Sequence, residues 1–290
     1  MYGAIIGDIV GSKYEFGNFK SKEFPFFQKG CDYTDDTIMT VAVAKALLRS
    51  REEEVSFREV LVEEMQRFGR RFPHPQGAYG GRFAGWLRAE DPKPYNSYGN
   101  GSAMRVSPCG LIAVSMEEAL ALAEASAVVT HNHPEGIKGA KAAAAAVFMA
   151  RSGAAKEEIR EYIQENFYPL DKTLDEIRPA YRFDESCQGT VPQAIIAFLE
   201  SDSFEDAIRN AVSLGGDSDT IGAITGSIAW SFYWGRCWDA PLPDDMKRMR
   251  DQAMAMLPAE LLDVVREFEE IAVHRWTAWV RIGLVKPIKT

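Results

Sequence analysis

The stretch YTDDTIMTVAVAKALL, residues 33–48, decides the fold. Two adjacent acids, Asp35 and Asp36, stand between threonines and are followed directly by a long apolar run. Thr and Asp side chains accept hydrogen bonds from the free N–H groups of a first helical turn, and acidic residues there suit the helix dipole. The stretch therefore predicts a helix that begins near Thr34. A helix this apolar belongs at the centre of a packed molecule.

A second stretch, SLGGDSDTIGAITGSIAW at residues 213–230, repeats this arrangement. Asp217, Asp219 and Thr220 precede another uncharged run, and the two glycines ahead of them are typical of the end of the preceding helix. The simplest interpretation of each acidic pair is helix capping. However, one carboxylate is enough to satisfy a helix start, and four carboxylates brought together would repel one another unless a cation lay between them.

The oxygen ligands in these two stretches also suit a metal site. Carboxylate and hydroxyl oxygens are preferred by hard cations such as Mg²⁺, Mn²⁺ or Ca²⁺. Two cations bridged by shared carboxylates would neutralise the four acids. Both interpretations stay open at this point, because the sequence does not show whether the two helix starts meet.

The rest of the chain has helical periodicity almost throughout. Apolar residues recur at three- and four-residue spacing, and the strict alternation of β-strands is missing. The periodic segments are 56–72, 115–129, 136–152, 155–167, 203–214 and 258–273. We therefore predict an all-α fold. No linker or break in composition divides residues 1–290, so we expect a single compact domain.

One segment breaks the helical pattern. Residues 72–108 are dense in Gly, Pro, Asn, Tyr and Ser. They predict a long irregular segment, and such a segment inside a compact domain is typically functional. A third acidic element precedes it near the N-terminus, where Asp8 lies between glycines and Glu15 precedes an aromatic residue. The simplest interpretation of Asp8 is that it caps or braces a neighbouring loop.

The composition excludes several classes of function. The net charge is −9 and no segment concentrates Lys and Arg, so nucleic-acid binding is not expected. Four widely spaced cysteines predict no disulfide framework. The apolar N-terminal segment lacks the features of a signal peptide, and no uninterrupted apolar run reaches the roughly 20 residues of a membrane span. We expect a cytoplasmic protein without membrane contact; no oligomeric state follows from the sequence.

Five motifs together resemble those of the ADP-ribosylglycohydrolases, the family named after the dinitrogenase reductase-activating enzyme. In chain order they are GDIVGSKYEF at 7–16, YTDDT at 33–37, YGNGSAMRVSP at 98–108, THNHPEGIKGA at 130–140 and LGGDSDT at 214–220. TDDT alone is a weak signal, whereas TDDT with a distant GGDSDT and GNGSAMR between them is specific. The likeness runs from about Gly3 to about Trp234.

This resemblance implies an all-α fold with a binuclear Mg²⁺ or Mn²⁺ centre in a cleft. The implied metal ligands are the threonine and the acids of two motifs: Thr34, Asp35, Asp36, Asp217, Asp219 and Thr220. Glu15 matches a glutamate that faces the ribose and activates water. The implied substrate-binding residues are those of the middle loop, which wraps the pyrophosphate and adenosine, and one histidine: Ser97, Tyr98, Gly99, Asn100, Gly101 and His131.

The implied chemistry also follows from the residue types. Hydrolysis at the ribose C1″ passes through an oxocarbenium-like state, and carboxylates such as Glu15, Asp35 and Asp36 can stabilise that charge or deprotonate water. Arg105 could bind phosphate through its guanidinium, or instead form a structural pair with a carboxylate. Tyr98 could stack on adenine, or instead pack in the core. For His133, hydrogen bonding at a helix start is the preferred interpretation.

We therefore predict a metal-dependent hydrolase that removes ADP-ribose from a protein side chain or a small-molecule acceptor. Two alternatives belong to other classes: a catalytically inactive ADP-ribose-binding or structural protein on the same fold, and a binuclear nucleotide phosphoesterase. The acceptor stays open among arginine, serine, an acyl group and a nucleobase. We expect residues 72–95 to shape the mouth of the cleft and to select the acceptor.

Overall fold

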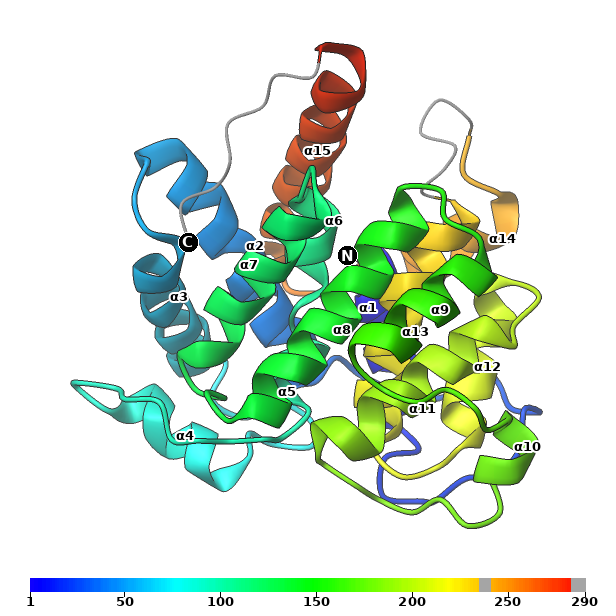
Figure 1. Ribbon diagram of the computed structural model, residues 1–290. Helices are drawn as coiled ribbons and strands as arrows, with labels where there is room; N and C mark the ends of the chain where they lie inside the picture. Colours follow the sequence, from blue (N-terminus) through cyan, green and yellow to red (C-terminus); the bar gives the residue numbers. More distant parts are fainter. Residues whose placement is uncertain (235–240, 283–290) are drawn as a thin grey trace.

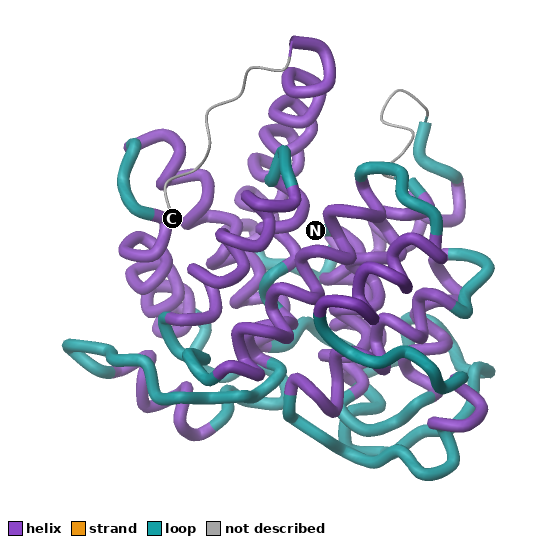
Figure 2. The backbone as a smooth tube through the Cα atoms, viewed as in Figure 1, coloured by secondary structure: helices purple, strands orange, loops and turns teal. Residues whose placement is uncertain are grey.

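The structure, a computed structural model, describes residues 1–234 and 241–282. This part of the chain consists of helices joined by loops, without a β-strand and with two isolated β-bridges (Figures 1 and 2). The helices are α1 (Tyr2–Ser12), α2 (Asp35–Glu53), α3 (Phe57–Arg71), α4 (Gly81–Arg88), α5 (Gly101–Met104), α6 (Ser107–Ile112), α7 (Met116–Val128), α8 (Pro134–Arg151), α9 (Lys156–Asn166), α10 (Leu174–Ile177), α11 (Cys187–Leu199), α12 (Phe204–Ser213), α13 (Ser218–Tyr233), α14 (Asp244–Met254) and α15 (Ala259–Ile282). The prediction of an all-α fold is confirmed.

The two apolar helices that the sequence places at the centre are α2 and α13. Every residue of α13 from Ser218 to Ser231 is buried, and this helix lies among α1, α8, α11 and α12 (Figure 1). Helix α2 is buried along most of its length and packs against α3, α6 and α15. Both helices therefore hold their acidic starts inside the molecule rather than on its surface.

Helix α1 packs on α13 with the two backbones in direct contact. Gly3, Gly7 and Gly11 recur every fourth residue on one face of α1, and Gly222 and Gly226 lie opposite on α13. A Cβ atom on Gly7 would lie 1.9 Å from the carbonyl oxygen of Gly222, and one on Gly3 would lie 2.1 Å from that of Gly226. Because no side chain fits between the backbones, the glycines fix α1 and α13 at a single close distance.

The six periodic segments correspond to α3, α7, α8, α9, α12 and α15. The expectation of an irregular segment over residues 72–108 is wrong in part, because α4 and α5 lie inside it and α6 begins there. Helix α4 buries Phe83, Trp86 and Leu87, a spacing that itself predicts a helix. The helix was not predicted because it is short and is flanked by glycines and prolines, which are typical of loops.

The loops between the helices are not spread evenly. Most of the long ones gather at the lower end of the molecule as drawn in Figure 2. Cys31, Cys109 and Cys187 are free thiols, in line with the prediction of no disulfide framework, and all three are buried; Cys237 lies outside the described residues. None of the described helices combines the length and the apolarity needed to cross a lipid bilayer.

Candidate active site

The starts of α2 and α13 meet at one pocket. The Thr220 hydroxyl at the start of α13 donates a hydrogen bond to Asp36 Oδ2 at the start of α2, at 3.3 Å. The pocket has a volume of about 480 Å³. Its walls come from the turn after α1, the starts of α2 and α13, the loop before α4, the loop before α5 and the segment before α11. Segments that are up to about two hundred residues apart in the chain therefore share one cavity.

Five carboxylates form the acidic cluster at one end of this pocket. They are Glu15, Asp35, Asp36, Asp217 and Asp219. Carboxylate oxygens of Glu15, Asp217 and Asp219 all lie within 4.8 Å of one another. Among the described residues no Lys, Arg or His forms an ion pair with any member of the cluster. Glu15 Oε2 and Asp36 Oδ1 are buried without a hydrogen-bond partner.

Burial and mutual repulsion raise the pKa of every carboxyl in the acidic cluster. Burial, followed by the charge of Asp217, raises the pKa of Glu15 to about 7. The pKa values of Asp35, Asp36 and Asp219 rise well above their usual range, again chiefly through burial and then through neighbouring aspartates. Five acids in this position cannot all be ionised near neutral pH unless a positive charge enters the cluster.

Asp8 of α1, which does not line the pocket, holds the start of α2 in place. Its carboxylate is fully buried and accepts hydrogen bonds from the backbone N–H groups of Thr34 and Thr37, both at 3.0 Å. It also accepts from both threonine hydroxyls, that of Thr34 at 2.7 Å. Thr34 in turn caps α2 by accepting from the N–H of Asp36 at 3.1 Å. The cap of α2 is therefore Thr34 rather than one of the two acids, Asp217 at the start of α13 makes no side-chain cap bond, and the bracing interpretation of Asp8 is confirmed.

Replacing Asp8 by Asn tests this brace. An amide has one acceptor oxygen and would present an NH₂ group to a threonine donor, so we expect a loss of about 3 kcal/mol of unfolding free energy. For a domain of this size that corresponds to a melting temperature roughly 6–12 °C lower. Asp263→Asn on the exposed face of α15 is the matched control and should melt like the wild type. Equal melting temperatures for both variants would refute the brace.

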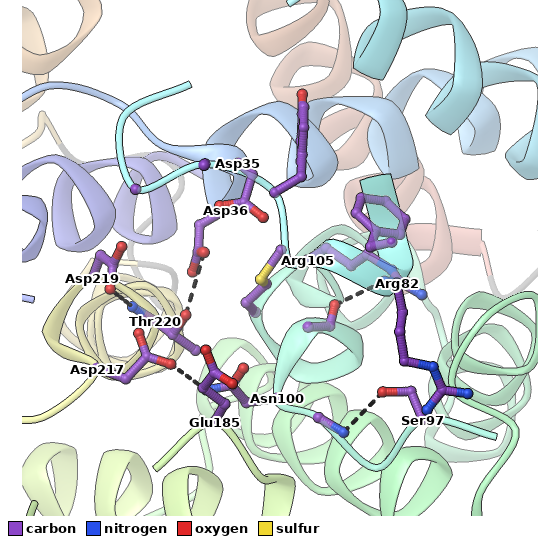
Figure 3. Close-up of a pocket in the computed structure, with 18 of the residues that line it drawn as sticks. Asp35, Asp36, Arg82, Ser97, Asn100, Arg105, Glu185, Asp217, Asp219 and Thr220 are labelled. Atoms are coloured by element: carbon purple, nitrogen blue, oxygen red, sulfur yellow. Dashed lines mark hydrogen bonds between the residues drawn. The ribbon is translucent and has the colours of Figure 1, made fainter. Parts of the chain in front are cut away.

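The loop before α5 supports the other half of the acidic cluster. The side-chain amide of Asn100 donates to Asp217 Oδ2 at 2.6 Å and to the Thr190 hydroxyl at 3.0 Å. The backbone N–H of Asn100 donates to the carbonyl oxygen of Glu185 at 2.7 Å. Asn100, expected from the sequence to touch the substrate, therefore orients a carboxylate of the cluster as well as lining the pocket (Figure 3).

The opposite end of the pocket carries positive charge (Figure 3). Arg105 is buried, and it donates to the carbonyl oxygens of Gly101 and Ser126 and to the Thr130 hydroxyl, each at 2.9 Å. Among the described residues no carboxylate pairs with Arg105, so the alternative of a structural ion pair is wrong. Burial lowers the pKa of Arg105 to about 10, which leaves it charged at neutral pH.

His131 lies beside this arginine. Its Nδ1 is 2.7 Å from the hydroxyl of Thr130, which also accepts from Arg105. Burial, and then the charges of Arg105 and Arg82, hold the pKa of His131 well below its usual range, so the imidazole is neutral at pH 7. His133 caps α8 by accepting from the N–H of Glu135 at 3.1 Å, as preferred from the sequence.

The structure brings most of the expected site residues to the pocket, with two exceptions. The residues that line it are Glu15, Asp35, Asp36, Ser97, Gly99, Asn100, Gly101, Arg105, His131, Asp217, Asp219 and Thr220. Thr34 lies behind this lining, against Asp8. Tyr98 is 52% exposed, lies outside the lining and packs edge-on against His133, so it is neither in the pocket nor in the core.

Several lining residues were not singled out in the sequence, although one of them, Arg82, lies in residues 72–95, which were expected to shape the mouth of the cleft. Arg82 of α4 enters the pocket, with its guanidinium 4.8 Å from the ring centre of Tyr95 (Figure 3). Phe16, Phe183 and Glu185 form part of the rim. Phe16 directly follows Glu15, so its motif already marked its position. Arg82, Phe183 and Glu185 lie in segments without a recognisable motif, and only the folded chain brings them to the site.

The helical fold, the acidic pocket and a match to a known family together place the chain among the hydrolases. The chain belongs to the ADP-ribosylglycohydrolase family, because the model of that family matches residues 1–280. It is therefore a hydrolase that acts on glycosidic bonds of ADP-ribose.

Individual relatives agree with this assignment. The ADP-ribosylarginine hydrolase Tri1 of Pseudomonas putida is 27% identical over 275 residues, which cover 80% of this chain and 69% of the relative. The ADP-ribosylhydrolase ARH3 of Mus musculus is 26% identical over 312 residues, covering 80% of this chain and 82% of the relative. A solved ADP-ribosylglycohydrolase-related protein complex superposes with a TM-score of 0.66 at 23% identity, covers 95% of this chain and 94% of that chain, and shows the same fold.

Proposed function

We propose that this protein hydrolyses the bond between the ribose C1″ of ADP-ribose and an acceptor, with two divalent cations, Mg²⁺ or Mn²⁺, held by the acidic cluster. The substrate is an ADP-ribosylated protein or a small-molecule conjugate of ADP-ribose. The observation that carries the proposal is the pocket itself, which has five carboxylates at one end and a buried arginine at the other.

The residues present fit a site for hard cations. All side-chain ligands that we propose are oxygens, from Asp35, Asp36, Asp217 and Asp219 and from two threonines. Asp36 Oδ1 is buried without a partner, which is unfavourable unless a cation or water completes it. Thr34 keeps one free lone pair after bonding to Asp8 and to the N–H of Asp36.

Each end of the pocket matches one part of ADP-ribose. When bound, the cations supply Lewis acidity and positions for the cis-diol of the ribose. The Arg105 guanidinium provides positive charge for the pyrophosphate, and Gly99 and Gly101 let backbone N–H groups approach the phosphate oxygens. Charge therefore orients the substrate, with its anionic part at Arg105 and its ribose at the carboxylates.

Glu15 is the group that we propose to take the proton from the attacking water. Its Oε2 is buried beside Asp217 and Asp219 without a hydrogen-bond partner, so this oxygen is available to accept a proton from a water bound in the cluster. Two of the other four carboxylates, Asp35 and Asp36, lie at the same end of the pocket and stabilise the positive charge that develops at C1″. Asn100 and Asp8 keep the two halves of the cluster in register.

Titration calorimetry of ADP-ribose tests the ligand and the metals together. With metal-stripped protein we expect weak or undetectable binding, because repulsion between the five acids leaves the ribose end of the pocket unsuited to its ligand. After addition of Mg²⁺ or Mn²⁺ we expect binding at least about 100-fold tighter, which is about 2.7 kcal/mol. Binding that is equally tight with and without metal would refute the metal centre.

The products separate this function from its alternatives. Glycosidic hydrolysis releases intact ADP-ribose and an intact acceptor, whereas a nucleotide phosphoesterase would release AMP or phosphate. A catalytically inactive binding protein would bind ADP-ribose and release nothing. Chromatography of the products from an ADP-ribosylated peptide distinguishes all three.

A further inference from the structure

Two aromatic rings are exposed at the rim of the pocket. Phe16 is 74% exposed and Phe183 is 43% exposed, and their rings stack on one another with centres 5.8 Å apart. Among the described residues the other large hydrophobic side chains with comparable exposure are Val55 and Tyr98, and neither lines the pocket. Exposed aromatic surface at the edge of a cavity is typical of a contact site for a ligand.

The segment that carries Phe183 is held firmly in place. The carbonyl oxygen of Glu185 accepts from the N–H of Asn100, and the N–H of Cys187 donates to the carbonyl oxygen of Tyr98 at 2.9 Å. Asp184 accepts from the N–H and the hydroxyl of Ser186, at 2.8 and 2.6 Å. The backbone that carries Phe183 and Glu185 is therefore tied to the loop that also supports Asp217.

Glu185 adds a negative charge to the same rim. Its side chain is exposed and lines the pocket (Figure 3), and it makes no hydrogen bond or ion pair to any other described residue. We name Phe16, Phe183 and Glu185 together the aromatic rim. Two ring faces beside a carboxylate are the surroundings that a planar cation prefers, because it can stack on a ring and donate to the carboxylate at the same time.

The position of the aromatic rim tells which part of the substrate reaches it. Phe16 directly follows Glu15 of the acidic cluster, so the rim lies at the acidic end of the pocket, whereas Arg105 and Arg82 lie at the other. Phosphate groups would be repelled by Glu15 and Glu185. With the pyrophosphate at the arginines and the ribose at the acids, the group that remains for the rim is the one leaving C1″.

We propose that the aromatic rim receives the leaving group and selects a planar cation, the guanidinium of an ADP-ribosylated arginine, over a neutral hydroxyl acceptor. The inference rests on the proposed function and names its acceptor. In the reaction the bond between C1″ and the guanidino nitrogen breaks and the oxygen of water bonds to C1″. One proton of that water goes to the nitrogen, so arginine leaves as an intact guanidinium.

Two peptides of the same sequence, one ADP-ribosylated on arginine and one on serine, test the selection. For the wild type with Mn²⁺ we expect kcat/KM on the arginine peptide to be at least about tenfold higher. Phe183→Leu removes the ring and Glu185→Gln removes the charge. Each should lower kcat/KM on the arginine peptide about tenfold, and change kcat/KM on the serine peptide and the Kd for ADP-ribose less than about twofold.

Matched controls lie on α9 and on the residue that directly follows it, neither of which lines the pocket. Phe167→Leu and Glu161→Gln should leave both values of kcat/KM unchanged. Preference for the serine peptide, or equal losses on both peptides, would overturn the selection. A rise in the Kd for ADP-ribose in Phe183→Leu as large as the loss in kcat/KM would overturn it too, because the ring would then stack on adenine. If the protein binds ADP-ribose but cleaves neither peptide, the result would refute the proposed hydrolysis, and the proposed role of the aromatic rim would be refuted with it.

Discussion

Replacing Asp219 by Asn is expected to abolish hydrolysis and leave the helical fold intact. Asp219 has carboxylate oxygens near those of Glu15 and Asp217, and no described cation balances them. An amide would remove one proposed metal ligand. Mutation of groups that only support a ligand already costs about 10–100-fold in metal affinity or activity, so we expect kcat/KM to fall by more than about 100-fold.

Release of ADP-ribose from a modified peptide at saturating Mn²⁺ measures this loss, and far-UV circular dichroism reports the helices. Asp171→Asn changes an exposed aspartate outside the pocket and is the matched control, with activity equal to the wild type. Wild-type turnover in Asp219→Asn would exclude Asp219 from the metal site. Loss of the helical signal would assign it a structural role instead.

Gly7→Ala is expected to have the largest effect on stability. The added methyl group would lie 1.9 Å from the carbonyl oxygen of Gly222 and 2.3 Å from its carbon, and backbone atoms cannot turn aside as a side chain would. We expect a loss of about 4 kcal/mol, at the upper end of single substitutions. Against a total stability of about 5–15 kcal/mol, this leaves a protein that melts roughly 10 °C lower or fails to accumulate.

A second glycine provides the control. Gly85 lies inside α4, and a Cβ atom there would meet nothing within 4 Å. Because alanine favours the helix over glycine by about 0.8–1.0 kcal/mol, Gly85→Ala should be neutral or slightly stabilising. Thermal unfolding followed by circular dichroism compares the two variants. If Gly7→Ala melts at the wild-type temperature, the backbone contact between α1 and α13 is not as close as described.

The sequence predicts the class of fold, the two buried helices that carry the acidic residues, and two of the helix caps. Helical periodicity and two apolar runs were enough for an all-α molecule with α2 and α13 inside, because burial of such runs is dictated by their composition. The caps at Thr34 and His133 could also be read directly, since a cap depends only on neighbours in the chain.

Other features depend on contacts between distant segments. That Thr220 reaches Asp36 depends on α1 packing against α13 and binding the start of α2 at the same time, which involves segments far apart in the chain. The role of Asn100 also depends on a distant contact. Its motif predicts a substrate-binding residue, whereas the structure shows that its side-chain amide also donates a hydrogen bond to Asp217. The positions of Phe183 and Glu185 in the site could not be predicted from the sequence, because hydrogen bonds to the loop before α5 place the segment that carries them.

Helix α1 touches both halves of the acidic cluster at once, through its glycine face toward α13 and through Asp8 toward α2. The two halves stand almost two hundred residues apart in the chain, so neither the N-terminal nor the C-terminal part can assemble a cation site alone. If the cluster holds cations as we propose, their binding is coupled to global folding: ions that bind only the assembled cluster stabilise the whole fold, by an amount that grows with their free concentration. If the acidic cluster holds Mg²⁺ or Mn²⁺ as we propose, a shortage of the free ion is expected to lower both the activity and the stability of the protein, and a protease would then degrade the metal-free molecules first.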